Sequence, residues 1–432
     1  MERKIKKSLL DWKSNQQKKP LILQGARQVG KTYSLLSFGK EHYKNTAYFS
    51  LEESAEYMAV FDRDLKPERI IKELSALSGI TIMPEDTLII LDEIQACEKA
   101  LTSLKYFCEQ APQYHIIAAG SLLGVAVKRE NFSFPVGKVD MLHLHPMDFE
   151  EFLWAIGKKD ICNLIRDSIS EFTPLSIHDT AMDLYKTYLV VGGMPAAVSE
   201  YVKKQDFDFV KAEQKTLNNS YIADMAKYAT AQDTIRIKAV WESLPAQLAK
   251  ENRKFQYKVI RSGARAGDYE FPLDWLNSAG MINKCINVRE GKMPLSAYAE
   301  NGTFKVYMVD TGLLCSKFDI AANVILHTPH SFDGFKGALC ENYICQALVT
   351  LGITPYYWTS SGKAEVDFVF QNKEGLIIPL EAKSAENVKA KSLRSYRDIY
   401  KPEYVIRVSG KNFGFENGIK SVPLYALFAL TF

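Results

Sequence analysis

The sequence contains no uninterrupted run of about 18 apolar residues, which is the length that a membrane-crossing helix requires. Residues 1–20 carry basic side chains but neither an apolar core nor a small-residue cleavage site, so they are not typical of a secretory signal. The seven cysteines are scattered and form no Cys-x-x-Cys pair, which indicates reduced thiols and disfavours a zinc site. We therefore expect a cytoplasmic protein that does not bind a membrane.

A strong charge of either sign is also absent. The 54 lysines and arginines nearly balance the 51 acids, and a net charge of +3 is too small to indicate nucleic-acid binding. Among the seven histidines, His143 and His145 would share one face of a strand, but no third ligand follows at metal-site spacing. The 432 residues, 47% of them hydrophobic, allow about two to four globular domains.

The first third of the chain alternates short apolar runs with helical patterns. The predicted strands, in chain order, are 21–24, 46–51, 87–91 and 115–119. Helical patterns lie between them, including 66–79 and 98–110. Apolar strands that alternate with helices are typical of a parallel sheet covered on both faces. We therefore predict an α/β domain over 1–147.

After residue 147 the pattern changes twice. Residues 148–230 have helical periodicity without strands, interrupted at 192–195, and are predicted to form a helical lid or linker. Residues 231–310 contain three predicted helices followed by a hairpin, which is a winged-helix layout. Residues 311–432 return to helices and strands and predict a second α/β domain.

Residues 25–32 read GARQVGKT and fit the phosphate-binding pattern G-x-x-x-x-G-K-[ST]. The glycines let the backbone curl so that N–H groups point at a β-phosphate, and the next helix adds its positive N-terminal end. We expect Lys31 to reach the β- and γ-phosphates and Thr32 to place a hydroxyl on Mg²⁺. The predicted nucleotide-binding residues are Gly25, Ala26, Arg27, Gln28, Val29, Gly30, Lys31 and Thr32. This P-loop predicts ATP as ligand, although no motif separates ATP from GTP.

A second motif, LIILDE at 88–93, is an apolar strand that ends in two adjacent acids. Asp92 is predicted to hold Mg²⁺, partly through water, and Glu93 to orient and activate the attacking water. Ser121 follows the next strand, where a polar sensor of the γ-phosphate is expected; an ordinary turn serine is the alternative. Lys31, Glu93 and Ser121 are thus the predicted catalytic residues.

Several segments, in this order, resemble a family of prokaryotic AAA-type P-loop ATPases that carry a C-terminal domain of unknown function. They read GARQVGKT, LDEIQ, GSLLG, HPMDFEEFL and YLVVGGMP, followed by LPAQLAKE, DWLNSAGMI, VDTGLL and GALCENYI. The resemblance covers nearly the whole chain and implies an AAA-like core, a helical segment, a winged helix and a nuclease-like C-terminal fold.

One position departs from that family. Relatives have Gly-Arg where this chain has Gly137 and Lys138. A lysine is a point charge and does not reproduce the planar fork of a guanidinium. The sequence therefore predicts ATP binding more directly than efficient ATP hydrolysis. Arg27 and Arg129 are other arginines near the motifs, but neither has a diagnostic spacing.

Three acids and a lysine near the C-terminus form a second constellation. Glu341 lies in a predicted helix, Asp367 in a strand, and Glu381 and Lys383 lie two apart in the next strand, where they share a face. The pattern resembles PD-(D/E)XK nucleases, in which Asp367 and Glu381 would bind Mg²⁺ and Lys383 would position or activate water. The alternatives are a retained scaffold that binds DNA or protein without cutting, and a coincidental cluster of charges.

The predicted fold is therefore an α/β P-loop sheet, a helical lid, a winged helix and a restriction-endonuclease-like domain. Three functions stay open. The first is a Mg²⁺-dependent ATPase that acts as a nucleotide-driven switch for a C-terminal domain engaging DNA or protein. The second is an ATP-regulated, Mg²⁺-dependent DNA nuclease, and the third is a nucleotide-bound adaptor that does not hydrolyse. The expected ligands are ATP and Mg²⁺, while DNA, a protein partner and self-association stay open.

Overall fold

The structure of the chain is a computed structural model. The structure describes residues 1–121, 134–250, 253–327, 333–360, 364–383 and 391–431. They divide into two compact units. The first unit contains 1–145 together with 278–280, and the second contains 146–277 together with 281–432.

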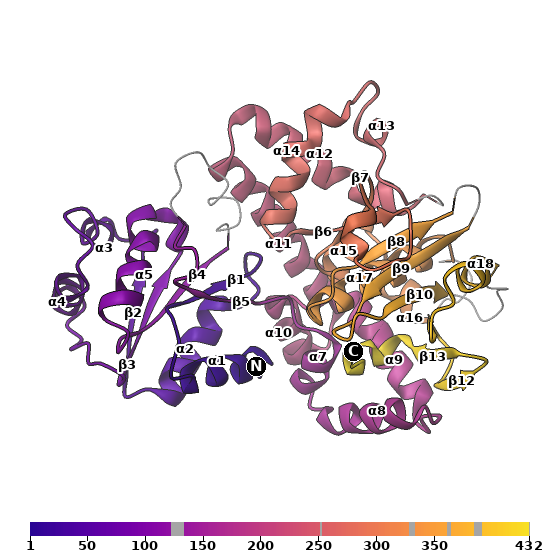
Figure 1. The fold of residues 1–432 in the computed structure, drawn as a ribbon, viewed down its shortest axis with the longest axis horizontal. Helices are drawn as coiled ribbons and strands as arrows, with labels where there is room; N and C mark the ends of the chain where they lie inside the picture. The colour runs from indigo at the N-terminus through magenta and orange to yellow at the C-terminus, as the bar shows by residue number, and fades with distance from the viewer. Residues whose placement is uncertain (122–133, 251–252, 328–332, 361–363, 384–390, 432) are drawn as a thin grey trace. The chain divides into compact units, whose positions relative to one another are not determined.

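The first unit is built on a five-stranded sheet (Figure 1). Its strands are β1 (Leu21–Gln24), β2 (Asn45–Ser50), β3 (Thr87–Asp92), β4 (His115–Gly120) and β5 (Asp140–His143). The order across the sheet is β2-β3-β4-β1-β5, and every pair is parallel. The carboxyl ends of all five strands therefore lie along one edge. The predicted parallel sheet is confirmed.

Helices connect these strands. They are α1 (Ile5–Ser14), α2 (Lys31–His42), α3 (Ala55–Ala59), α4 (Pro67–Ser78) and α5 (Glu98–Gln110), with a short 3₁₀ turn η1 (Ile94–Ala96). Local sequence explains the bounds of α4: Pro67 occupies the first turn, where its missing N–H is not needed, and Gly79 ends the helix at φ 69°.

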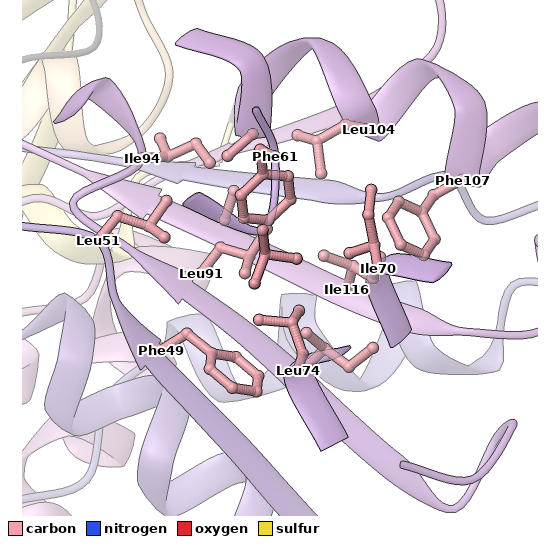
Figure 2. Packing of buried hydrophobic residues seen from close by; sticks show 14 of the residues in the cluster. Phe49, Leu51, Phe61, Ile70, Leu74, Leu91, Ile94, Leu104, Phe107 and Ile116 are labelled. Atoms are coloured by element: carbon pink, nitrogen blue, oxygen red, sulfur yellow. The ribbon is translucent and has the colours of Figure 1, made fainter. Parts of the chain in front are cut away.

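One face of the sheet packs against α4 and α5 (Figure 2). Phe49 and Leu91 from the strands meet Ile70 and Leu74 of α4 and Phe107 of α5, and each is at most 2% exposed. Burying one such side chain contributes about 1.5–3 kcal/mol. Because side chains alternate along a strand, Asp92, which follows Leu91, points to the opposite face of the sheet, where α2 lies.

The second unit begins with a helical region. Its helices are α7 (Phe149–Ala155), α8 (Lys159–Glu171), α9 (His178–Val191), α10 (Pro195–Lys204), α11 (Phe207–Tyr228), α12 (Ala231–Leu248), α13 (Tyr257–Ile260) and α14 (Ala266–Ser278). Residues 148–230 are all described and contain helices without a strand, as predicted. The predicted break at 192–195 is also confirmed, because α9 ends and α10 begins there.

An eight-stranded mixed sheet forms the rest of the second unit (Figure 1). Its strands are β6 (Ile282–Val288), β7 (Ala299–Met308), β8 (Tyr356–Thr359), β9 (Glu365–Gln371), β10 (Ile377–Lys383), β11 (Val405–Ser409), β12 (Gly414–Glu416) and β13 (Ile419–Pro423). The order is β12-β13-β11-β10-β9-β8-β6-β7. The accompanying helices are α15 (Thr311–Phe318), α16 (Ala322–His327), α17 (Asp333–Thr350) and α18 (Lys391–Tyr400), with 3₁₀ turns η2 (Leu295–Tyr298) and η3 (Leu424–Ala429).

The hairpin expected in the predicted winged helix belongs to this same sheet. Strands β6 and β7 pair antiparallel, and β6 also pairs parallel with β8, with Ile286 opposite Tyr356. Hydrogen bonding of the sheet thus crosses the boundary predicted at residue 310. The division into 1–147, 148–230, 231–310 and 311–432 stays a prediction.

A buried carboxylate joins separate segments of the second unit. Asp310 caps α15 through Leu313 N and also accepts a 2.6 Å hydrogen bond from Gly193 N. The Met147 amide donates to the Gly193 carbonyl, and the Tyr188 hydroxyl donates to the Met147 carbonyl. Burial raises the pKa of Asp310 to about 6. The sequence segments HPMDFEEFL, YLVVGGMP and VDTGLL therefore meet in one junction.

Candidate nucleotide site

The loop between β1 and α2 has the curled backbone that its sequence predicts. Gly25 has a φ of 153°, Gly30 a φ of 93° and Gln28 a φ of 63°. A Cβ at Gly25 would lie 2.2 Å from the carbonyl oxygen of Leu144, so a side chain is excluded there by backbone contact as well as by conformation. The loop is thus shaped by glycine and supported from the segment that follows β5.

Lys31 begins α2 and folds back onto this loop. Its ammonium group donates hydrogen bonds to the carbonyl oxygens of Gly25 at 3.0 Å and Ala26 at 2.9 Å. The residue is 6% exposed, and burial lowers its pKa to about 8, opposed by the charges of Glu93 and Asp92 and assisted by Arg27. A buried cation held only by carbonyl oxygens is well placed to move onto an incoming phosphate.

The next residue meets the acid at the end of β3. The Thr32 hydroxyl donates to Oδ2 of Asp92 at 2.7 Å, and the Tyr48 hydroxyl donates to the same oxygen at 3.0 Å. The other oxygen of Asp92 accepts the backbone N–H of Glu93 at 3.0 Å. The two predicted Mg²⁺ ligands, Thr32 and Asp92, are therefore adjacent. Tyr48 was not predicted from the sequence, because a tyrosine in an apolar strand is ordinarily a packing residue.

Glu93 follows with a left-handed backbone, at φ 51°. Its Oε2 accepts a hydrogen bond from Gln95 Nε2 at 2.5 Å and a long one from the Ser121 hydroxyl at 3.5 Å. The structure thus brings together the three predicted catalytic residues, since the charge of Glu93 also acts on the pKa of Lys31. Gln95 was not identified from the sequence, although it lies within the LDEIQ segment.

Arg3 connects the P-loop to the end of the first unit. Its guanidinium donates to the carbonyl oxygen of Val29 at 2.8 Å and to that of His145 at 2.6 Å. Leu144 N donates to Gln24 O at 2.7 Å, so the chain leaving β5 runs directly along the loop. Nothing in the local sequence pattern indicates this role for Arg3, because its partners lie far away in the chain.

Among the described residues, none of the contacts around the P-loop places an arginine where a γ-phosphate would bind. Lys138 forms an ion pair with Glu109 at 2.8 Å. Arg27 lies within the loop and acts on the pKa of Lys31, while Arg129 lies outside the described residues. The source of an arginine for hydrolysis therefore stays open.

The residues present fit a nucleotide with Mg²⁺. A threonine hydroxyl and one carboxylate are hard oxygen ligands, and Mg²⁺ completes such a shell with phosphate oxygens and waters. Within the described ranges, no three His, Cys, Asp or Glu side chains are grouped to hold a metal by themselves. The P-loop edge of the sheet is thus suited to a metal that arrives with its nucleotide.

The second predicted site is only partly assembled. β9 and β10 pair antiparallel, as predicted, with Phe368 opposite Leu380, and Asp367 Oδ2 accepts the backbone N–H of Ala382 at 2.9 Å. Lys383 forms an ion pair with Glu381 at 2.7 Å. Glu341, on α17, instead contacts Arg253 and the Tyr307 hydroxyl.

Comparisons with known proteins give three family matches. Residues 17–153 match the family described as "AAA domain". Residues 182–323 match "Domain of unknown function (DUF8612)", and residues 336–427 match "Domain of unknown function (DUF4143)". No curated protein matches the chain.

Among solved structures, the chain is similar to the Aeropyrum pernix ORC2 protein in its ADPNP–ADP complexes, with 11% identity, 78% of this chain and 92% of that chain covered, and a TM-score of 0.33. The RuvB Holliday junction branch migration motor of Thermotoga maritima has 15% identity and a TM-score of 0.30, and the match covers 64% of this chain and 83% of that chain. AMPPCP-bound DnaA of Aquifex aeolicus has 13% identity and a TM-score of 0.29, and the match covers 63% of this chain and 85% of that chain.

In the part of the chain that the structure describes, no helix is long and apolar enough to cross a membrane. The family match over 17–153 and the parallel sheet with its curled P-loop are independent observations of the same segment. Residues 17–153 thus match the AAA domain family and have the P-loop and parallel sheet described above.

Proposed function

We propose that the chain is a Mg²⁺-dependent ATPase whose nucleotide state controls what its second unit binds. One observation carries the hydrolytic part: the Thr32 hydroxyl lies 2.7 Å from Asp92 Oδ2, beside Lys31 and Glu93. Two oxygen ligands for Mg²⁺, a cation for the phosphates and a carboxylate for the attacking water thereby meet at one edge of the sheet.

The control part is supported by Arg3. Its two hydrogen bonds tie the P-loop carbonyl of Val29 to the carbonyl of His145, which is the last residue before the second unit begins. When a phosphate draws Lys31 away from the carbonyls of Gly25 and Ala26, the loop must readjust. Arg3 and the Gly25–Leu144 contact would pass that readjustment to the exit of the chain.

Turnover measurements test the hydrolytic part. We expect wild type to hydrolyse ATP in the presence of Mg²⁺ and Glu93→Gln to bind ATP but hydrolyse it at least about 100-fold more slowly, as is typical for loss of a general base. Lys40→Ala, an exposed lysine at the other end of α2, is the matched control for purification and should retain full activity. Equal turnover by wild type and Glu93→Gln would support the non-hydrolysing adaptor instead.

Hydrogen exchange tests the control part. ATP with Mg²⁺ is expected to change amide exchange in α7 and α10 of wild type, and Arg3→Met is expected to bind ATP while losing most of that change. Lys6→Met removes an ion pair with the exposed Glu41 and is the control in α1, the helix that follows Arg3. The rate of ATP turnover, measured with and without duplex DNA, then tests whether the second unit binds DNA.

A further inference from the structure

A pocket lies among the helices α9, α10, α11, α15 and α16 of the second unit (Figure 1). α9 contacts each of the other four helices, and all the residues that line the pocket fall between 190 and 323. The volume of the pocket is about 580 Å³, which is typical of a site for a small molecule. We name it the helical pocket and ask which ligand chemistry its side chains favour.

Gln214 of α11 is a buried polar side chain at the helical pocket, with 3% of its surface exposed. Its Nε2 donates hydrogen bonds to the carbonyl oxygens of Val190 at 2.8 Å and Val191 at 3.0 Å. These two acceptors fix the orientation of the amide, because a flipped amide would turn its oxygen towards two carbonyl oxygens. None of the described residues donates a hydrogen bond to the other amide atom, Oε1. A buried acceptor is therefore available to a ligand.

A second buried polar group lies at the same pocket. Ser316 of α15 is 7% exposed, and its Oγ has no hydrogen-bond partner in the parts of the chain that the structure describes. Buried polar atoms without a partner reduce stability, so most of them are satisfied by ordered water or by a ligand. Gln214 and Ser316 thus give the pocket two polar groups that the fold itself does not use.

Both lysines that line the helical pocket, Lys204 and Lys211, already have acidic partners. The ammonium of Lys204 lies 2.9 Å from Glu200 and 3.5 Å from the centre of the Phe209 ring. The ammonium of Lys211 lies 2.8 Å from Asp319. Neither Glu200 nor Asp319 lines the pocket, so the positive charges are directed to acids beside it.

The two acids that line the pocket lack such partners. Asp206 is the N-cap of α11, where its side chain accepts the backbone N–H of Asp208 at 2.8 Å. Within the described ranges, neither carboxylate forms an ion pair. Residues 328–332, which follow α16 and lie outside those ranges, contain no lysine or arginine. The charge that this pocket offers to a ligand is therefore negative.

Helix ends around the pocket have the same preference. α9 ends at Val191, α10 at Lys204 and α15 at Phe318, and the carboxyl end of a helix carries partial negative charge that favours a cation. α11 and α16 begin at the pocket and oppose this effect, although α16 has only six residues. The positive end of α11 corresponds to about half a charge, which its two acids exceed.

We propose that the helical pocket binds a small organic cation with amine or guanidinium groups, whose N–H groups donate to Gln214 Oε1 and to the carboxylates of Asp206 and Asp208. The Ser316 hydroxyl is a further acceptor. Phe207 and Ile320, which also line the pocket, suit the aliphatic stem of such a ligand. The pocket lies wholly within the second unit, so its ligand does not depend on the nucleotide site.

The position of Gln214 connects this ligand to the junction at Asp310. Gln214 holds the carbonyl of Val191, which precedes Gly192, and the next amide, that of Gly193, donates to Asp310. A Cβ on Gly312 would lie 2.5 Å from the Val191 carbonyl oxygen, so the segments pack closely there. A cation bound to Gln214 is therefore expected to stabilise the junction.

Calorimetric titration with agmatine, which carries one amine and one guanidinium, tests the proposal on the full chain without nucleotide. Wild type is expected to bind agmatine, and its melting temperature should rise with agmatine concentration. Succinate, a small dianion, should not bind. Failure of agmatine to bind, or preferential binding of succinate, would overturn the proposal. Binding of a triarginine peptide but not of agmatine would assign the pocket to a protein partner and overturn it as well.

Substitution of the acids locates the binding. Asp208→Asn removes one exposed charge and should weaken agmatine binding by up to about fivefold. Addition of Asp206→Asn, which still caps α11, should weaken it by roughly tenfold or more in total. Glu213→Gln removes one charge from the same helix outside the pocket and is the charge-matched control, which should bind as wild type does. Equal affinity of wild type and the double variant would contradict the site.

The buried acceptor is tested by Gln214→Met, which keeps the length of the side chain but lacks Oε1. We expect agmatine binding roughly tenfold weaker than in wild type, the effect of one lost hydrogen bond to a charged group. A folded Gln214→Met variant with wild-type affinity would overturn the proposal. Since this change also removes the donors to Val190 and Val191, Ser316→Ala is measured beside it and should weaken binding by about threefold. Unchanged affinity in Ser316→Ala and in the double acid variant would equally reject the pocket.

Discussion

Thr32 and Asp92, sixty positions apart in sequence, share a hydrogen bond of 2.7 Å between the threonine hydroxyl and Oδ2 of the aspartate. The parallel sheet explains this contact, because β1 leads into the helix that begins beside Thr32 and β3 ends at Asp92 on the same edge. Each oxygen is a ligand that Mg²⁺ prefers. Thr32 and Asp92 are the residues that would hold a Mg²⁺ that arrives with ATP.

Lys31 makes ATP binding dependent on pH. Burial lowers the pKa of Lys31 in the folded protein from 10.5 to about 8. Between pH 8 and pH 10.5 the folded protein therefore binds fewer protons than the unfolded chain. The contribution of Lys31 to the free energy of unfolding rises with pH across that range. The charged form is the one that attracts phosphate, so ATP affinity of wild type is expected to fall as pH rises through about 8. Calorimetry in two buffers of different ionisation enthalpy should record proton uptake on binding near pH 8.5.

Lys31→Arg is the control for this pH dependence. Arginine stays charged over the whole range, so its affinity, although weaker at pH 7, should not fall between pH 8 and pH 9. The same pH dependence in both proteins would assign it to another group.

Tyr48 is expected to act as a positioning residue for Asp92. Tyr48→Phe removes only the hydroxyl that donates to Oδ2, so it should raise the Mg²⁺ concentration needed for half-maximal turnover by roughly tenfold, the lower end of the effect of one hydrogen bond to a charged acceptor. At saturating Mg²⁺ the turnover number should recover. Tyr43→Phe, whose hydroxyl is paired with His115, is the control, and an equal shift there would reject a specific role.

Gln95 is expected to orient Glu93. Gln95→Leu keeps the volume but loses the 2.5 Å hydrogen bond, so the turnover number should fall about tenfold while ATP affinity stays unchanged. Ser121→Ala should have a smaller effect, because its hydrogen bond to Glu93 is 3.5 Å long. Faster turnover by Gln95→Leu would mean that Gln95 restrains Glu93 in an unproductive orientation.

Gly25 is expected to tolerate no side chain. Gly25→Ala would bring a Cβ within 2.2 Å of the Leu144 carbonyl oxygen at a φ of 153°, and we expect a loss of about 3 kcal/mol or more in the free energy of unfolding of the first unit. Gly79→Ala is the control, since its Cβ meets open space and only its φ of 69° is unfavourable, at about 1 kcal/mol. Chemical denaturation of both variants makes the comparison.

Local sequence was sufficient for the P-loop and the main elements of the first unit. GARQVGKT and LIILDE are patterns in which residue types, spacing and flanking strand agree, so they identify Lys31, Thr32 and Asp92 without reference to their contacts. The sequence indicates β5 only through the spacing of His143 and His145, because Asp140–His143 is short and half-exposed and lacks an apolar run.

Long-range pairing set the limit of prediction elsewhere. The β6–β8 pairing joins Ile286 to Tyr356, and no local pattern reports which strand a given strand will choose. Likewise the partner of Glu341 is Arg253, 88 positions away, so the sequence shows the acid but not the cation that it contacts. Tyr48 and Gln95 escaped notice because their importance lies in a contact with an acid, not in a motif.

Titration of Mg²⁺·ATP into wild type, Lys31→Ala and Lys40→Ala tests the central claim most directly. Loss of a charge-assisted contact to phosphate is worth about 1.5–3 kcal/mol, so Lys31→Ala should bind roughly 10- to 100-fold more weakly than wild type, while Lys40→Ala should bind as wild type does. Binding of Mg²⁺·ATP with equal affinity by all three proteins, or by none of them, would contradict a nucleotide site at this P-loop.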